Sequence, residues 1–147
     1  MTSQAKSGFQ MFDFQVADFK YSNRIFHPVE ELMPHWEMTA QKFCQYDKEQ
    51  KRYVGTLMLD ISCTAGSAEA GLEIRCAPLA QFTFESEESD DAQTRMDKLL
   101  SLNGMFQLLG LVRPMLLLQA GILQMPIKCC IPSINLNKFV FGEKISF

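Results

Sequence analysis

Residues 96–127 read MDKLLSLNGMFQLLGLVRPMLLLQAGILQMPI, and after Lys98 the only charged residue in this stretch is Arg113. A long run rich in Leu and Met is typical of a helix. Pro114 lies inside it, and a proline removes a helical hydrogen bond and crowds the preceding turn. We therefore predict one long, proline-kinked helix, or two helical blocks, around which the rest of the chain is organised.

The same stretch is long enough to cross a bilayer. Against a membrane span, Arg113 lies at its centre, where a charge is costly in lipid. Polar amides are also spaced through it, at Asn103, Gln107, Gln119 and Gln124. We therefore expect a buried helix and no membrane insertion. One sheet face cannot cover a helix that is apolar on all sides, so self-association is predicted.

Before this helix, four segments alternate apolar and polar residues with the period of a half-buried strand. They cover residues 12–17, 36–46, 53–64 and 72–84. Short connections between strands imply an antiparallel meander. Pro78 has no N–H for a sheet ladder and should mark a bulge or an edge-facing position. The predicted fold class is α+β, a four-stranded antiparallel sheet packed with the long helix.

An acidic run, ESEESDD at residues 85–91, separates the last strand from the helix. Ser89 or Asp90 is expected to cap the helix, because a short polar side chain can accept a hydrogen bond from the free N–H groups of the first turn. The neighbouring acids are favoured there by the helix dipole.

The two ends of the chain are less regular than its middle. Residues 1–8 are small and polar and are predicted to be a disordered tail. Residues 126–147 carry two prolines and end in an aromatic-rich segment, which suits a crossing loop and a tail. The length leaves room for one domain, residues 1–147.

Charge and cysteine content restrict the function classes. The net charge is −3 and the pI is near 5.4, which argues against nucleic acid as a partner. Five cysteines without a CxxC spacing fit reduced thiols better than a disulfide framework or a zinc site. The N-terminus has no apolar run long enough for a signal peptide, so a cytoplasmic location is expected.

No catalytic constellation is present in the sequence. The two histidines, His27 and His35, lie in one proline-bearing loop, where a solvated histidine is the simplest interpretation. Cys129 and Cys130 are adjacent, which is poor geometry for a single metal ion. No phosphate-binding, nucleotide-binding or hydrolase motif occurs. We expect a binding protein without a metal or a cofactor, and not an enzyme.

Phe and Met are unusually frequent, with twelve and nine copies. They can simply form a core. They also suit a surface that repacks around different polypeptide partners. An antiparallel sheet wrapped around an apolar helix can alternatively enclose a small-ligand or lipid pocket, which is the second functional hypothesis.

Several features occur in the same order in one known family. They are FQVADFKYSNRIF (residues 14–26), Trp36, LEIRCAPLAQFTFE (residues 72–85), the spacing of Arg113, Pro126 and Pro132, and SINLN (residues 133–137). With the strand order and the Leu-rich helix, they make the chain resemble the SecB family of bacterial protein-export chaperones. The resemblance spans roughly residues 12–137.

The resemblance implies an ATP-independent holdase that keeps unfolded polypeptides soluble during protein transport. It also implies a homotetramer, a dimer of dimers whose long helices pack between sheets. Clients of the family lie in apolar grooves and pair with the sheet. Carried over to this chain, the groove residues are Trp36, Met38, Phe106, Leu109, Met125, Ile127 and Ile134.

The chain also departs from the family pattern. Acidic residues that dock the export ATPase SecA are replaced here by Asn23 and Arg75, which makes SecA docking doubtful because a reversed charge repels. The family's Gly-Gly pair in the fourth strand is replaced by Leu79-Ala80. Its C-terminal helix is replaced by the short segment FVFGEKISF. Some divergent members serve an antitoxin as client, and an antitoxin is a further candidate partner.

Overall fold

The computed structural model describes residues 8–25, 33–67, 69–126 and 130–147. The α+β class and the antiparallel sheet are confirmed, but the sheet has five strands instead of the predicted four. The elements, in chain order, are β1 (Phe9–Asn23), β2 (His35–Asp47), β3 (Arg52–Gly66), β4 (Gly71–Glu85), α1 (Asp90–Leu99), the π-helical segment η1 (Leu100–Gly104), α2 (Met105–Ile122) and β5 (Ile145–Ser146). Most of the predicted N-terminal tail, residues 1–7, lies outside the described residues.

The predicted meander is wrong, because the strand order is β1-β4-β3-β2-β5. Strands β2, β3 and β4 follow one another as antiparallel neighbours, whereas β1 pairs with β4 and not with β2. This is a Greek-key arrangement. Along the chain, residues 24–34 separate β1 from β2, a longer separation than those after β2 and β3.

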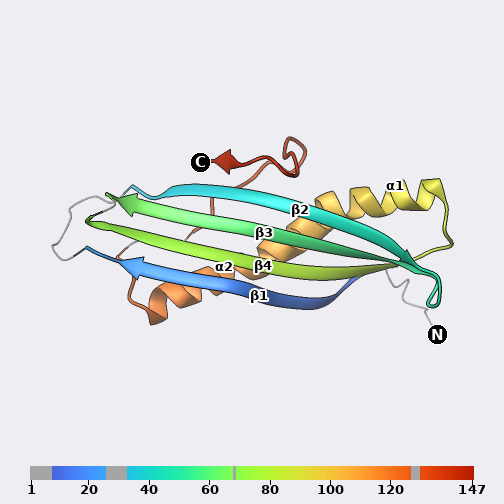
Figure 1. The fold of residues 1–147 in the computed structure, drawn as a ribbon, viewed down its shortest axis with the longest axis horizontal. Coiled ribbons are helices and arrows are strands. Elements are labelled where there is room, and N and C mark those ends of the chain that lie inside the picture. Colours follow the sequence, from blue (N-terminus) through green and yellow to red (C-terminus); the bar gives the residue numbers. More distant parts are fainter. Residues whose placement is uncertain (1–7, 26–32, 68, 127–129) are drawn as a thin grey trace, which may run out of the picture.

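The helix lies across one face of the sheet, behind the strands in the view of Figure 1. Along β3 and β4, alternate residues are buried on this inner face, as the period of two predicts. The helix comes close at Gly55 of β3. A Cβ atom added there would lie 2.7 Å from side-chain atoms of Leu100 and Met96, so any larger residue would force these side chains to move.

The helical stretch is continuous from Asp90 to Ile122. Ser89 is its N-cap, because its hydroxyl accepts a hydrogen bond from the Ala92 N–H at 3.0 Å, which confirms one of the two predicted caps. Pro114 lies within α2, and helix continues on both sides of it. The hydrogen bonding departs from the α pattern earlier, in η1. Asp90–Ile122 is long and apolar enough to cross a membrane, but core helices meet the same criterion.

Pro78 marks an irregularity in the sheet, as predicted. Opposite it, β1 shifts register between Val16 and Asp18. On the other side, β4 pairs with β3 at Leu79 opposite Met58 and next at Cys76 opposite Ile61. The two residues of β4 between these pairs, one of them Pro78, have no paired residue on β3. The missing N–H of proline explains why the ladder is interrupted there.

Candidate polypeptide-binding surface

The long helix buries one side and leaves large apolar side chains exposed on the other. Met105, Leu108, Val112 and Leu116 are buried against the sheet. The exposed large apolar residues of the helix and the residue after it are Leu102, Phe106, Leu111, Leu117, Leu118, Ile122 and Leu123. Apolar surface of this extent on a soluble protein usually marks an interaction site.

One part of this surface is hollowed. Phe106 is 73% exposed and lines a hollow of about 460 Å³ together with Leu102, Asn103 and Gln107 of the helix. Leu136 and Asn137 of the C-terminal segment form its other wall. The hollow therefore combines an exposed aromatic ring with amide side chains that can hydrogen-bond a peptide backbone.

Arg113 fastens the C-terminal segment to the helix. Its guanidinium donates to the carbonyl oxygens of Ile131, at 3.4 Å, and Pro132, at 3.2 Å. Ile131 is buried in the core. The charge that argued against a membrane span thus has a structural role, because it satisfies two carbonyl groups of a loop without regular structure.

Beyond this point the C-terminal segment reaches the free edge of β2. Ile145 pairs with Met38 and Ser146 with Glu37. Trp36 and Phe147 exchange two backbone hydrogen bonds, each of 2.9 Å. Figure 1 shows β5, in red, beside β2. This fifth strand is absent from the sequence-based prediction because two paired residues leave no readable alternation.

The structure separates the seven residues predicted to line a groove. Trp36, Met38 and Leu109 are buried, with exposures of 3%, 1% and 2%, and they offer a client almost no surface in this conformation. Phe106 is exposed. Met125 and Ile134 are half-buried and pack against the core. Ile127 lies outside the described residues. The groove assignment of these residues stays a prediction.

Lys42 connects three parts of the molecule at this edge. Its ammonium group lies 2.9 Å from Asp97 Oδ1 and 2.8 Å from Ser101 Oγ on the helix, and 4.6 Å from the ring centre of Phe141. Lys42 therefore interrupts the apolar face of β2 because its ammonium group joins the sheet to the helix and to the C-terminal segment. Burial, followed by the charge of Asp97, raises the pKa of the nearby Cys44 thiol.

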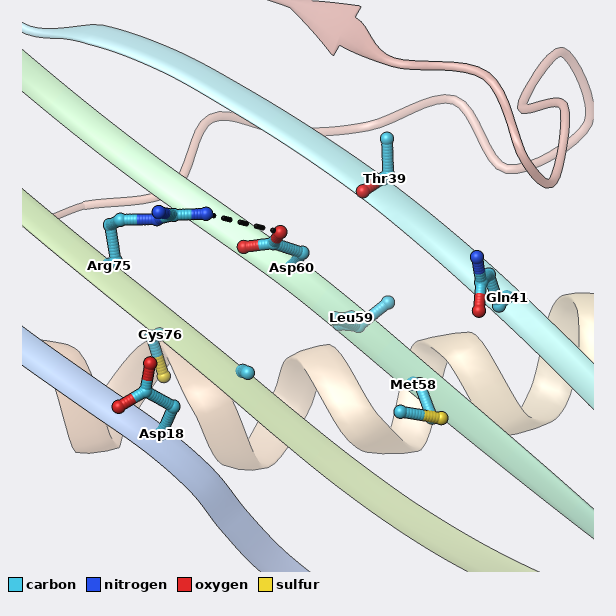
Figure 2. Close-up of a pocket in the computed structure, with 9 residues that line it drawn as sticks. Asp18, Thr39, Gln41, Met58, Leu59, Asp60, Arg75 and Cys76 are labelled. Atoms are coloured by element: carbon cyan, nitrogen blue, oxygen red, sulfur yellow. Dashed lines mark ion pairs between the residues drawn. The ribbon is translucent and has the colours of Figure 1, made fainter.

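The opposite face of the sheet carries a second hollow, of about 330 Å³, shown in Figure 2. Arg75 of β4 points toward Asp60 of β3, with 3.5 Å between Nη2 and Oδ2. The Arg75 and Asp60 side chains are 50% and 56% exposed, and an ion pair this exposed contributes little to stability. Arg75 therefore places a positive charge beside the Asp60 carboxylate on this face of the sheet.

Within residues 8–25, 33–67, 69–126 and 130–147, no group of three or more His, Cys, Asp or Glu is placed to hold a metal ion. The space between helix and sheet is filled by side chains such as Leu57, Phe82 and Leu100, each 0% exposed. The hollows at Phe106 and Arg75 lie on the surface, outside this interface.

Comparison with known proteins supports the fold. No protein-family model matches the chain, and no curated protein matches it. A SecB-like chaperone from Mycobacterium tuberculosis, solved in complex with a ChAD peptide from an antitoxin, is similar with a TM-score of 0.60. The similarity covers 86% of this chain and 90% of that one, at 14% identity. A protein of unknown function from Streptococcus agalactiae has a TM-score of 0.49 at 12% identity, over 85% of this chain and 97% of that one.

The chain therefore has a SecB-like fold. At this identity the likeness concerns the fold alone, and function has to be argued from the surface. The prediction missed Leu102 and Leu136 as lining residues of the hollow at Phe106. Leu102 could have been found, since it lies one helical turn before Phe106. Leu136 could not, because its place depends on the path of the C-terminal segment.

Proposed function

We propose that this protein is a SecB-like chaperone, an ATP-independent holdase that binds unfolded polypeptide segments and is not an enzyme. The observation that carries the proposal is the exposed Phe106 ring in a hollow between the helix and the C-terminal segment. An exposed aromatic residue beside flexible Leu side chains suits apolar segments of varied sequence. The SecB-like fold supports the same class of function.

Clients and location follow from the same proposal. The similar Mycobacterium tuberculosis chaperone binds an antitoxin peptide, so an antitoxin is one candidate client of this chain. A role in SecA-dependent protein export is less favoured, because Arg75 places a positive charge beside Asp60 on the outer face, where docking to SecA would require an acidic residue. The reduced cysteines suit the cytosol.

The proposed active form is an oligomer, as a dimer of dimers. The exposed apolar rows of α2 would be covered by another copy, while the hollow at Phe106 stays open. Leu118 and Ile122, each 64% exposed, lie towards the end of α2, away from η1 and Phe106. The helix is thus long enough to serve subunit contacts at one end and client contacts at the other.

The test is suppression of aggregation of a chemically unfolded client without nucleotide. We expect the purified protein to keep the client in solution at stoichiometric amounts, and Phe106→Ser to weaken this effect. Phe12→Ser is the matched control, because Phe12 is also an exposed phenylalanine, at 53%, but lies on β1, at the opposite edge of the sheet from β2, and does not line the hollow. Equal activity of the two variants, or no suppression by the unmodified protein, contradicts the proposal.

A further inference from the structure

We propose that the last part of the C-terminal segment, residues 139–147, occupies the edge of β2 as a stand-in for a client strand, and that a client segment binds by displacing these residues. This inference rests on the proposed function and specifies where and how the client pairs with the sheet. The occupant it requires is an extended polypeptide segment with apolar residues at alternate positions.

The first step is that the chain's own segment has this chemistry. Phe139, Phe141, Ile145 and Phe147 are half-buried and pack against the core, whereas Val140 and Ser146 between them are exposed. The segment therefore presents apolar side chains inward and backbone groups to β2, which is how an added strand binds a sheet edge.

The second step is that the segment is held weakly. Only Ile145 and Ser146 form strand pairs, flanked by the hydrogen bonds between Trp36 and Phe147. The ion pair of Lys144 with Glu37, at 3.3 Å, joins side chains that are 61% and 34% exposed, so solvent screens it. A further contact is made by Lys42, which lies 4.6 Å from the ring centre of Phe141. A longer client strand could replace these contacts and extend them.

The third step is that β2 has more edge than the segment uses. The Gly142 N–H donates to the Ala40 carbonyl oxygen at 2.9 Å, farther along this edge than the strand pairs of Ile145 and Ser146. Among the described residues, no strand pairs with the outer edge of β2 over residues 41–47. An unpaired edge of this kind is a template for an incoming strand.

The fourth step concerns the buried residues. Ile145 lies opposite Met38 in the ladder, and opposed residues of an antiparallel pair point to the same face. Phe147 lies opposite Trp36 in the same way. Displacing the segment would uncover Trp36 and Met38, which are 3% and 1% exposed while it is bound. Two residues that are core in this conformation would then contact the client.

A disulfide lock tests the proposal. Trp36 and Phe147 exchange both hydrogen bonds, so the next pair, Glu37 and Ser146, is a close non-hydrogen-bonded pair suited to a disulfide. The variant Glu37→Cys/Ser146→Cys, in a Cys129→Ser/Cys130→Ser background, should bind fluorescently labelled, carboxymethylated lactalbumin about tenfold or more weakly when oxidised than when reduced. Glu37→Ser in the same background, with Ser146 unchanged, is the control, because it loses the same ion pair without a cross-link.

A truncated chain ending at Gly142 tests the opposite direction. Without residues 143–147 the edge beside Trp36, Glu37 and Met38 is permanently free, so affinity for the same probe should rise several-fold, and a synthetic FVFGEKISF peptide should compete. If the oxidised lock binds as tightly as its reduced form, the displacement proposal is overturned while the holdase function stands. If no form binds the probe, both are overturned.

Discussion

Gly55 is the residue at which the sheet leaves least room for the helix. An added Cβ would lie 2.7 Å from Leu100 and Met96, both fully buried, so Gly55→Ala should lower the free energy of unfolding by about 1–3 kcal/mol through overpacking. Gly110→Ala is the control. No heavy atom lies within 4 Å of its added Cβ, and it should raise stability by about 0.5–1 kcal/mol by reducing backbone freedom. Urea unfolding at one protein concentration measures both.

Cys76 should be unreactive in the native protein. Burial, followed by the charges of Asp18 and Asp60, raises the pKa of its thiol to about 11. At pH near 8, iodoacetamide should therefore label exposed Cys130 and leave Cys76 unmodified, as peptide mass mapping would show. Rapid labelling of Cys76 without unfolding would contradict its burial.

The same thiol should make stability depend on pH. The unfolded chain releases this proton near its ordinary pKa of about 8.5, but the folded chain keeps it up to about 11. The folded state binds more protons in this window, so the free energy of unfolding should fall as the pH rises through it. Cys76→Ala should show a smaller fall in urea unfolding between pH values near 8 and 10. An unchanged slope would assign the effect to other groups.

At the scale of elements, the start of α1 depends on one side chain. The Ser89 hydroxyl accepts the Ala92 N–H, so Ser89→Ala should cost about 1 kcal/mol of stability. The backbone of Ser89 also exchanges hydrogen bonds with the Tyr53 hydroxyl, which the alanine variant retains. Ser86→Ala is the comparison. The exposed Ser86 hydroxyl donates to the carbonyl oxygen of the neighbouring Glu87, and its loss should change stability by less than about 0.5 kcal/mol.

At the scale of the whole molecule, a single copy leaves the exposed rows of α2 facing water. We expect a dimer or tetramer by light scattering, and Leu118→Asp/Ile122→Asp should shift the mass towards that of one chain, because charges cannot be buried at a contact without a partner. Phe43→Asp, on the outer face of the sheet, should leave the mass unchanged. A monomeric unmodified protein would remove the oligomer from the proposed function.

Local pattern alone was sufficient for the features that depend on residues close in sequence. The alternation in β3 and β4, the N-cap at Ser89 and the irregularity at Pro78 all follow from the chemistry of a few neighbouring residues. The apolar composition of residues 96–127 likewise determined that a long helix would need more cover than one sheet face offers.

The strand order and the fate of individual apolar residues were decided only by tertiary structure. The position of β1 beside β4 joins segments far apart in the chain, and alternation says which face a strand buries but not which strand is its neighbour. Trp36 and Phe106 show the same limit. Both are aromatic, yet Trp36, whose backbone pairs with Phe147 at the far end of the chain, is 3% exposed and Phe106 is 73% exposed, because burial depends on which other parts of the chain fold over a residue.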